Sequence, residues 1–142
     1  MLYNKILIAI DGSDAAEKAF DKALQVAKNN DAEIVLTHVN DVRTFASAGA
    51  YDRTLSERAE KYGKELLEEY IEKAKKADVT KVTTSLEYGS PKVKIAKDIA
   101  EKFEADLIIA GATGMNAVER FLIGSVTESI TRYAKCDVLI IR

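Results

Sequence analysis

The chain has 142 residues, of which 47% are hydrophobic and 31% are charged, with a formal net charge of -2. This length and composition are typical of a compact globular protein, so we expect a single domain over residues 1–142. The near-neutral charge disfavours DNA or RNA as a partner, because proteins that bind nucleic acid phosphates carry a basic surface.

The first part of the chain alternates strand and helix patterns. The apolar run Lys5 to Ile10 predicts a buried strand, and the next such run is Glu33 to Val39. Between them, residues Asp14 to Lys28 place apolar side chains on one helical stripe, with Ser13 or Asp14 as the predicted N-cap. The segment Asn40 to Arg53 has no steady period, and we interpret it as a long loop that serves as a lid, contacts a partner or is disordered.

The middle of the chain contains a longer helix and an alternating strand. Apolar residues predict a helix from about Leu55 to Ala77, and Thr54 with Glu57 has the spacing of a capping box. Residues Lys81 to Tyr88 alternate apolar and polar side chains, which indicates an edge strand with one polar face. The pair Ser90-Pro91 then predicts the start of a third helix, because proline is favoured at the first helical position.

The last part of the chain adds two strands and a helix. The runs Asp106 to Ala110 and Asp137 to Ile141 are nearly continuous in apolar residues and predict parallel strands covered on both faces. Residues Val126 to Ala134 predict the helix between them. Strands that alternate with helices indicate an α/β fold: an open, doubly wound sheet of five parallel strands with helices on both faces. Right-handed crossovers limit the possible topologies of this sheet but do not fix its strand order.

The most informative motif follows the fourth predicted strand. The glycines Gly111 and Gly114 come directly after this strand, and Gly124-Ser125 precedes the last helix. Glycines let backbone amides approach an anion, and the first turn of a helix adds unpaired N–H groups, so this loop has the parts needed to hold a triphosphate. The alternative is purely structural: a tight turn at the first two glycines and close packing at the third.

The first predicted strand ends in a second candidate motif, Asp11-Gly12-Ser13. Taken alone, this sequence is most simply a turn that caps the following helix. In an open α/β sheet, however, ligands bind beyond the carboxyl ends of the strands, where the strand order reverses. Beside a phosphate loop, the Asp11 carboxylate is expected to accept hydrogen bonds from adenine or ribose, or to help hold a divalent cation.

These features resemble the ATP-binding branch of the universal stress protein family. The family motif G-x2-G-x9-G-[S/T] is matched without a gap by Gly111, Gly114, Gly124 and Ser125, and the resemblance extends from the opening KILIAIDGSDAAEKA to the closing VLIIR. The resemblance implies an adenine nucleotide alpha-hydrolase-like fold with strand order 3-2-1-4-5. It also implies ATP as the ligand, accompanied by magnesium or manganese bound to its phosphates.

The resemblance further implies roles for single residues. Asp11 corresponds to the residue that contacts adenine and Val39 to the apolar wall of the base, while Gly111 approaches the ribose. The complete set of expected ATP-binding residues is Ala9, Asp11, Val39, Ala110, Gly111, Gly114, Gly124, Ser125 and Thr127. Family members pair their last strands in homodimers, which here implies an interface through Val138 to Ile141, although Asp137 stands where the family usually has proline.

Three functions remain open at this level. The first is an ATP-binding regulatory module of the stress response, acting as a homodimer through an unknown protein partner. The second is a slow ATPase or phosphotransferase, although no catalytic residue is assigned, because the only histidine, His38, is expected to be buried or to line the pocket. The third is a nucleotide-free dimeric scaffold.

The expected cellular setting rests on three features that the sequence lacks. A single cysteine, Cys136, cannot form an internal disulfide and is interpreted as a small buried hydrophobic residue. No apolar stretch is long enough for a membrane helix, and the apolar part of the N-terminus is too short for a signal peptide. We therefore expect a cytoplasmic protein with no membrane partner.

Overall fold

The computed structural model of the chain describes residues 2–41, 53–113 and 123–142. Five parallel strands form one sheet in the order β3-β2-β1-β4-β5, which confirms the predicted fold and strand order. The strands are β1 (Lys5–Ala9), β2 (Glu33–Asn40), β3 (Val82–Tyr88), β4 (Leu107–Gly111) and β5 (Asp137–Ile141). The helical elements are α1 (Asp14–Asn30), α3 (Arg53–Lys76), α4 (Pro91–Val93), η1 (Lys94–Ile99), α5 (Ala100–Lys102) and α6 (Ser125–Tyr133).

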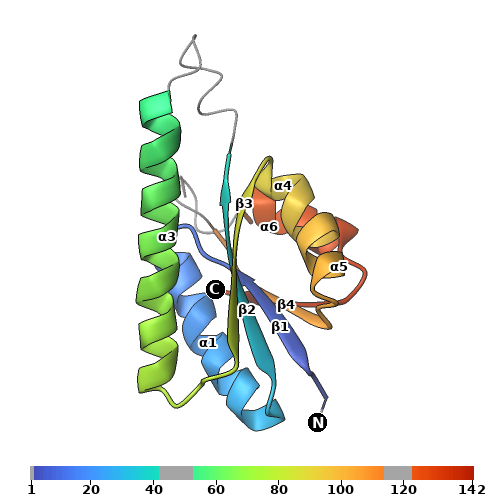
Figure 1. Cartoon of the computed structure of the whole chain (residues 1–142). Helices are drawn as coiled ribbons and strands as arrows, with labels where there is room; N and C mark the ends of the chain where they lie inside the picture. The colour runs from blue at the N-terminus through green and yellow to red at the C-terminus, as the bar shows by residue number, and fades with distance from the viewer. Residues whose placement is uncertain (1, 42–52, 114–122) are drawn as a thin grey trace.

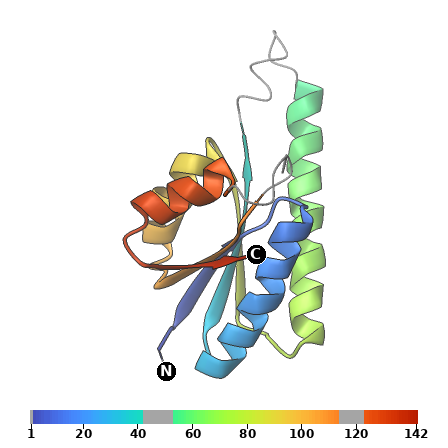
Figure 2. The ribbon, with the colours of Figure 1, turned by 180° about the vertical axis from the view of Figure 1, so that it is seen from behind.

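The helices cover both faces of the sheet. Helices α1 and α3 lie on one face, and α4, η1, α5 and α6 lie on the other (Figures 1 and 2). Each face buries its own apolar cluster: Ile6, Ile8 and Ile34 point toward α1 and α3, whereas Leu7 and Val35 point toward the opposite helices. The central strands are therefore apolar on both sides, as their nearly continuous hydrophobic runs predict.

Helix α1 shows how the local sequence sets an element's limits. The Ser13 hydroxyl accepts a hydrogen bond from the Ala16 amide at 3.1 Å, so Ser13 is the N-cap. Asp31 ends the helix in a left-handed conformation, and its amide bonds back to the last turn. The buried stripe includes Phe20, whose ring meets Tyr70 of α3 edge-to-face at 4.8 Å between centroids.

The helical segment after β3 is less regular than its sequence predicts. Ser90 occupies the N-cap position without a side-chain cap, and Pro91 is in the first turn, as expected. The middle of the segment, η1, is a π-helix rather than an α-helix. Its buried residues, Ile95, Ala96 and Ile99, belong to the apolar cluster on this face of the sheet.

Four local predictions need correction. Helix α3 already includes Arg53, so Thr54 is not its N-cap. Asn40 belongs to β2 rather than to the predicted loop. Residues 42–52 of that loop lie outside the described residues. Strand β5 is not covered on both faces, because it lies at the edge of the sheet and Leu139 is 38% exposed. Cys136 is half-buried rather than fully buried.

No helix within the described part of the chain is long and apolar enough to cross a membrane.

Candidate functional site

The strand order reverses between β1 and β4, so the carboxyl ends of these two strands form the topological switch point of the sheet. After β1 the chain enters α1 on one face and continues to β2, whereas after β4 it returns through α6 on the other face to β5. The N-termini of α1 and α6 therefore both lie at the carboxyl ends of the strands, on opposite faces of the β1–β4 pair (Figure 1). Ligands of open α/β sheets bind at such a switch point.

Small side chains line the sheet beside this point. Ala9 and Ala110 directly follow the paired residues Ile8 and Ile109 at the ends of β1 and β4. Both alanines pack against the apolar cluster on the α6 face, and so does Val39 at the end of β2. The structure therefore brings together, on one face, the three residues expected to line a base pocket.

The turn after β1 is held by its own side chains. The Ser13 amide donates to Asp11 Oδ1 at 2.9 Å, and Gly12 between them has a φ of +83°, a conformation that favours glycine. Ser13 in turn caps α1. The capping role considered for this motif is thus present, and it fixes the Asp11 carboxylate at the carboxyl end of β1.

Gly111, at the end of β4, is required for packing. A Cβ atom built on it would lie 2.7 Å from the backbone oxygen of Ala15 and 2.8 Å from its carbonyl carbon, in the first turn of α1. The Gly111 carbonyl accepts a hydrogen bond from the Thr127 hydroxyl at 2.7 Å, and Thr127 is 5% exposed. This bond ties the first turn of α6 to the end of β4, so Thr127 contributes to the position of the helix.

The N-terminus of α6 is closed onto β4 but is not capped by a side chain. The Gly124 amide donates to the Ala112 carbonyl at 2.8 Å, and the Glu128 amide donates to the Gly124 carbonyl at 2.9 Å. No side chain of the described residues caps this helix. The first turn of α6, which begins at the exposed Ser125, presents its amides at the positive end of the helix dipole, where an anion is stabilised.

One expected site residue, Gly114, lies within residues 114–122, outside the described residues. Among residues 2–41, 53–113 and 123–142, no group of three or more His, Cys, Asp or Glu side chains is arranged to hold a metal ion.

The two remaining candidate groups lie away from the switch point. His38 is buried, as expected, but it faces α3 on the opposite side of the sheet from Ala9, Val39 and Ala110. Burial raises the pKa of the Cys136 thiol, with a smaller contribution in the same direction from the charge of Asp137. A thiol of raised pKa holds less of the reactive thiolate at neutral pH.

Sequence reasoning missed the polar contacts beneath α3. Asn40 falls in the predicted loop and Tyr62 in the predicted helix from Leu55 to Ala77, yet both contact His38. The alternation of side chains along a strand provides the missing signal, because residues 38 and 40 of one strand point to the same face.

Comparison with known proteins places the chain in a family. The family model described as the universal stress protein family matches residues 2–142. A universal stress protein of Staphylococcus haemolyticus is 49% identical over 142 residues, which cover all of this chain and 86% of that protein. The similarity therefore extends along nearly the whole of both chains.

Solved structures agree with this placement. The universal stress protein UspA from Lactobacillus plantarum superposes with a TM-score of 0.84 at 30% identity, over 100% of this chain and 99% of that one. A universal stress protein crystallised in complex with cAMP gives a TM-score of 0.77 at 26% identity, over 100% and 99% of the two chains. The sequence, the strand order and these similarities lead to one conclusion: this chain belongs to the universal stress protein family.

Proposed function

We propose that the protein is an ATP-binding regulatory module of the stress response, which binds the nucleotide at the switch point between β1 and β4. The observation that carries the proposal is the pair of helix N-termini at this point, together with the uncapped first turn of α6. An anion placed there meets free amides and the positive ends of helix dipoles. The glycine motif that ends in Gly124 and Ser125 supports a phosphate chain as that anion.

The opposite end of the nucleotide would lie on the small residues of the sheet. Ala9 and Ala110 leave room beside the strands, Val39 offers an apolar contact to a base, and the Asp11 carboxylate is available to polar groups of adenine or ribose. The related universal stress protein in complex with cAMP supports an adenine nucleotide as the ligand class. A magnesium or manganese ion would be bound through the phosphates, because the described residues offer no cluster of ligands.

We further propose that the protein acts in the cytoplasm as a homodimer through β5. Strand β5 is an edge of the sheet, and its apolar residues Val138 to Ile141 are only partly covered. A second copy of the same strand would satisfy its free backbone groups and cover Leu139. The Asp137 carboxylate accepts a hydrogen bond from the Tyr3 hydroxyl at 2.8 Å, so its charge already has a partner within the chain.

The first alternative is an enzyme, a slow ATPase or phosphotransferase. The position of His38 argues against it, because this side chain lies on the α3 face and not beside the expected phosphates. The second alternative is a nucleotide-free dimeric scaffold, which requires that the wild-type protein does not bind nucleotide at all.

The test is calorimetric titration of nucleotide-stripped protein with ATP and magnesium, with AMP and cAMP titrated separately. We expect micromolar binding of ATP and its loss in Gly114→Val, because a branched side chain on the glycine loop would block the approach of backbone amides to the phosphates. Thr80→Val is the matched control. Thr80 is exposed and precedes β3, so it lies at the amino ends of the strands, whereas the site lies at their carboxyl ends.

Each result has a definite meaning. Unchanged affinity in a folded Gly114→Val protein would contradict the glycine loop as the phosphate site. Absence of binding to all three nucleotides by the wild-type protein would leave the dimeric scaffold as the better account. Release of phosphate from ATP that disappears in Gly114→Val would favour the enzyme.

A further inference from the structure

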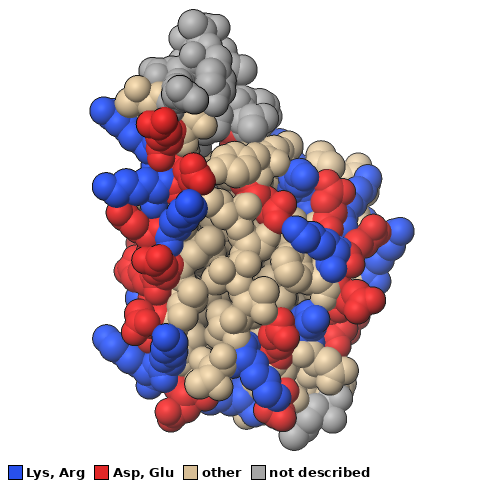
Figure 3. All heavy atoms as spheres, in the orientation of Figure 1, with Lys and Arg blue, Asp and Glu red and all other residues tan. Residues whose placement is uncertain are grey.

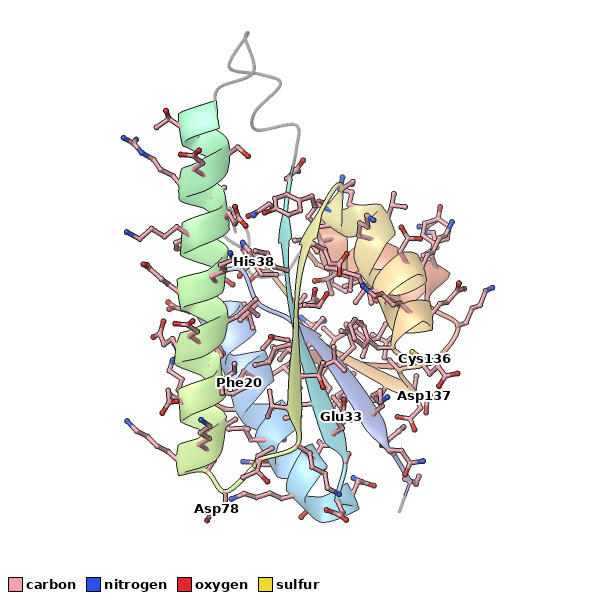
Figure 4. All side chains as sticks on the ribbon, in the orientation of Figure 1. Phe20, Glu33, His38, Asp78, Cys136 and Asp137 are labelled. Carbon is pink, nitrogen blue, oxygen red and sulfur yellow. The ribbon has the colours of Figure 1, made fainter. Side chains whose placement is uncertain are left out.

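A buried polar cluster lies beneath α3, on the face of the sheet away from the proposed nucleotide pocket. His38 and Asn40 come from β2 and are 8% and 6% exposed. His38 Nδ1 lies 2.7 Å from the carbonyl oxygen of Ile10, and Nε2 lies 3.1 Å from Asn40 Oδ1. Figure 4 shows His38 between α3 and the strands.

The first of these contacts determines the position of one proton. A carbonyl oxygen can only accept a hydrogen bond, so Nδ1 of His38 must carry a proton and donate it to Ile10. In a neutral imidazole, Nε2 then has only a lone pair. An amide oxygen opposite that lone pair would be repulsive, so the second contact needs a donor on one side or the other.

Two arrangements provide this donor. Either the imidazole is also protonated at Nε2 and donates to Asn40 Oδ1, or the Asn40 amide is turned so that its nitrogen donates to Nε2. With the amide oxygen toward Nε2, the Asn40 amide nitrogen is buried and has no hydrogen-bond partner among the described residues. The bond from Nδ1–H to the Ile10 carbonyl is common to both arrangements.

This bond acts on the turn that precedes α1. Ile10 directly precedes Asp11, and its own amide donates to the Thr37 carbonyl at 2.9 Å. Residues of β2 therefore hold both backbone groups of Ile10: Thr37 accepts from its amide, and His38 bonds to its carbonyl. The next residue along the chain is Asp11, the residue expected to contact adenine.

Helix α3 packs against this cluster through Tyr62 and Gly63. The Tyr62 ring meets the His38 ring edge-to-face at 5.8 Å between centroids, and the Tyr62 hydroxyl lies against Gly12 of the same turn. Gly63 allows this close approach, because a Cβ atom there would lie 3.0 Å from His38 Cδ2. Tyr62 is the titratable side chain that packs against the imidazole from α3, while β1 and β2 present the Ile10 carbonyl and the Asn40 amide.

We propose that His38 is a positioning residue for the nucleotide site: through Nδ1–H it fixes the Ile10 carbonyl and thereby holds the Asp11-Gly12-Ser13 turn in its binding geometry. The inference rests on the proposed function for the identity of the ligand. The fixed geometry of the turn itself can be measured without a ligand.

The affinity test compares two substitutions of His38. His38→Leu removes the donor but keeps an apolar side chain of moderate size, and we expect ATP to bind roughly tenfold more weakly, a scale typical of lost orienting partners. His38→Asn places an amide nitrogen near the position of Nδ1, and we expect affinity within about threefold of wild type because the hydrogen bond can re-form.

Thr37→Val is the matched control for this pair. The Thr37 hydroxyl also makes one buried side-chain bond from β2 to a carbonyl, that of Ser85 at 3.1 Å, but this bond is directed to β3 and not to the turn. We expect unchanged affinity in Thr37→Val. Wild-type affinity in a folded His38→Leu protein, or an equal loss in His38→Leu and Thr37→Val, would overturn the proposal.

The second test uses the unaltered, nucleotide-free chain. His38 is the only histidine in the sequence, so its side-chain ¹⁵N resonances are unambiguous. We expect a proton on Nδ1 at neutral pH, and the tautomer protonated only at Nε2 would overturn the proposal. This measurement needs no variant and does not depend on the folding of one.

Hydrogen exchange separates the inference from the proposed function. We expect the Ser13 amide, which is bonded to Asp11 Oδ1, to exchange faster in His38→Leu than in Thr37→Val. If wild-type protein binds no nucleotide, the proposed function fails, and this exchange difference still shows whether His38 holds the turn. Equal exchange in the two variants would overturn the positioning role.

Discussion

At the scale of single residues, Glu87 shows how a charged side chain is accommodated on the sheet. Its side chain is 18% exposed, and its carboxylate accepts a hydrogen bond from the Ser85 hydroxyl. Lys102 Nζ of α5 lies 3.4 Å from the same carboxylate. The Ser85 hydrogen bond lowers the pKa of Glu87 below its ordinary value of 4.5, with a smaller contribution from the charge of Lys102, while burial acts in the opposite direction.

Ser85→Ala should therefore destabilise the protein in a pH-dependent way. A carboxyl group with a lowered pKa stabilises the folded state above its unfolded pKa, and this contribution is lost as the pH falls through the folded pKa. We expect a loss of about 1 kcal/mol in the free energy of unfolding at pH 7, typical of one hydrogen bond, and a smaller loss toward pH 3. Urea unfolding at both pH values measures this difference.

The neighbouring residue provides the comparison. Thr84 is exposed on the same strand, and Thr84→Ala should change the stability equally at the two pH values. A loss in Ser85→Ala that is just as large at pH 3 as at pH 7 would contradict the assigned effect on Glu87.

At the scale of elements, the sheet has two edge strands with different surroundings. On the face shown in Figure 3, charged side chains follow α3 on one flank and the α4–α5 segment on the other, with an uncharged area between them over β3. Strand β5, at the other edge, carries the partly exposed residues Val138 to Ile141. Exposed edges of this kind are covered in proteins by pairing or protected by charge.

The dimer proposal predicts different effects of a charge at the two edges. Leu139→Glu places a carboxylate on the exposed apolar side of β5, and we expect it to convert the dimer to a monomer because the charge would be buried between two copies. Thr84→Glu places the same group on β3 and should leave the dimer intact. Sedimentation velocity at matched concentrations measures both masses.

The opposite pattern would identify a different interface. A dimer that survives Leu139→Glu and dissociates in Thr84→Glu would assign the contact to β3. A wild-type protein that is monomeric at micromolar concentration would refute the homodimer.

At the scale of the whole molecule, a ligand at the switch point couples parts of the chain that are distant in sequence. The candidate site draws on the ends of β1, β2 and β4 and on the first turns of α1 and α6. A nucleotide that contacts all of them binds only the folded chain. Its binding free energy is therefore added to the stability of the fold.

ATP with magnesium should accordingly raise the thermal unfolding midpoint. At a concentration 100 times the dissociation constant, binding adds about 2.7 kcal/mol, which corresponds to roughly 10 °C for a chain of this size. Differential scanning calorimetry measures the shift, and Gly114→Val under the same conditions should show none. An equal shift in both proteins would indicate that ATP binds elsewhere.

The sequence by itself determined the elements and their order. Periodic apolar residues located every described strand and helix to within a few residues, because burial on one or both faces of an element leaves a repeating pattern. The match of Gly111, Gly124 and Ser125 to a family motif pointed to the end of β4 and the start of α6. Local signals also identified Ser13 as a candidate cap for α1.

Only the tertiary structure decided how these parts meet. The close approach of Ala15 to Gly111, the bond from Thr127 to the Gly111 carbonyl and the placement of His38 under α3 all join residues far apart in the chain. Such contacts leave no local pattern, because they depend on the register of the strands and on the face from which each helix packs. The π-helical turn of η1 also has no signature in the sequence, because its apolar spacing fits an α-helix equally well.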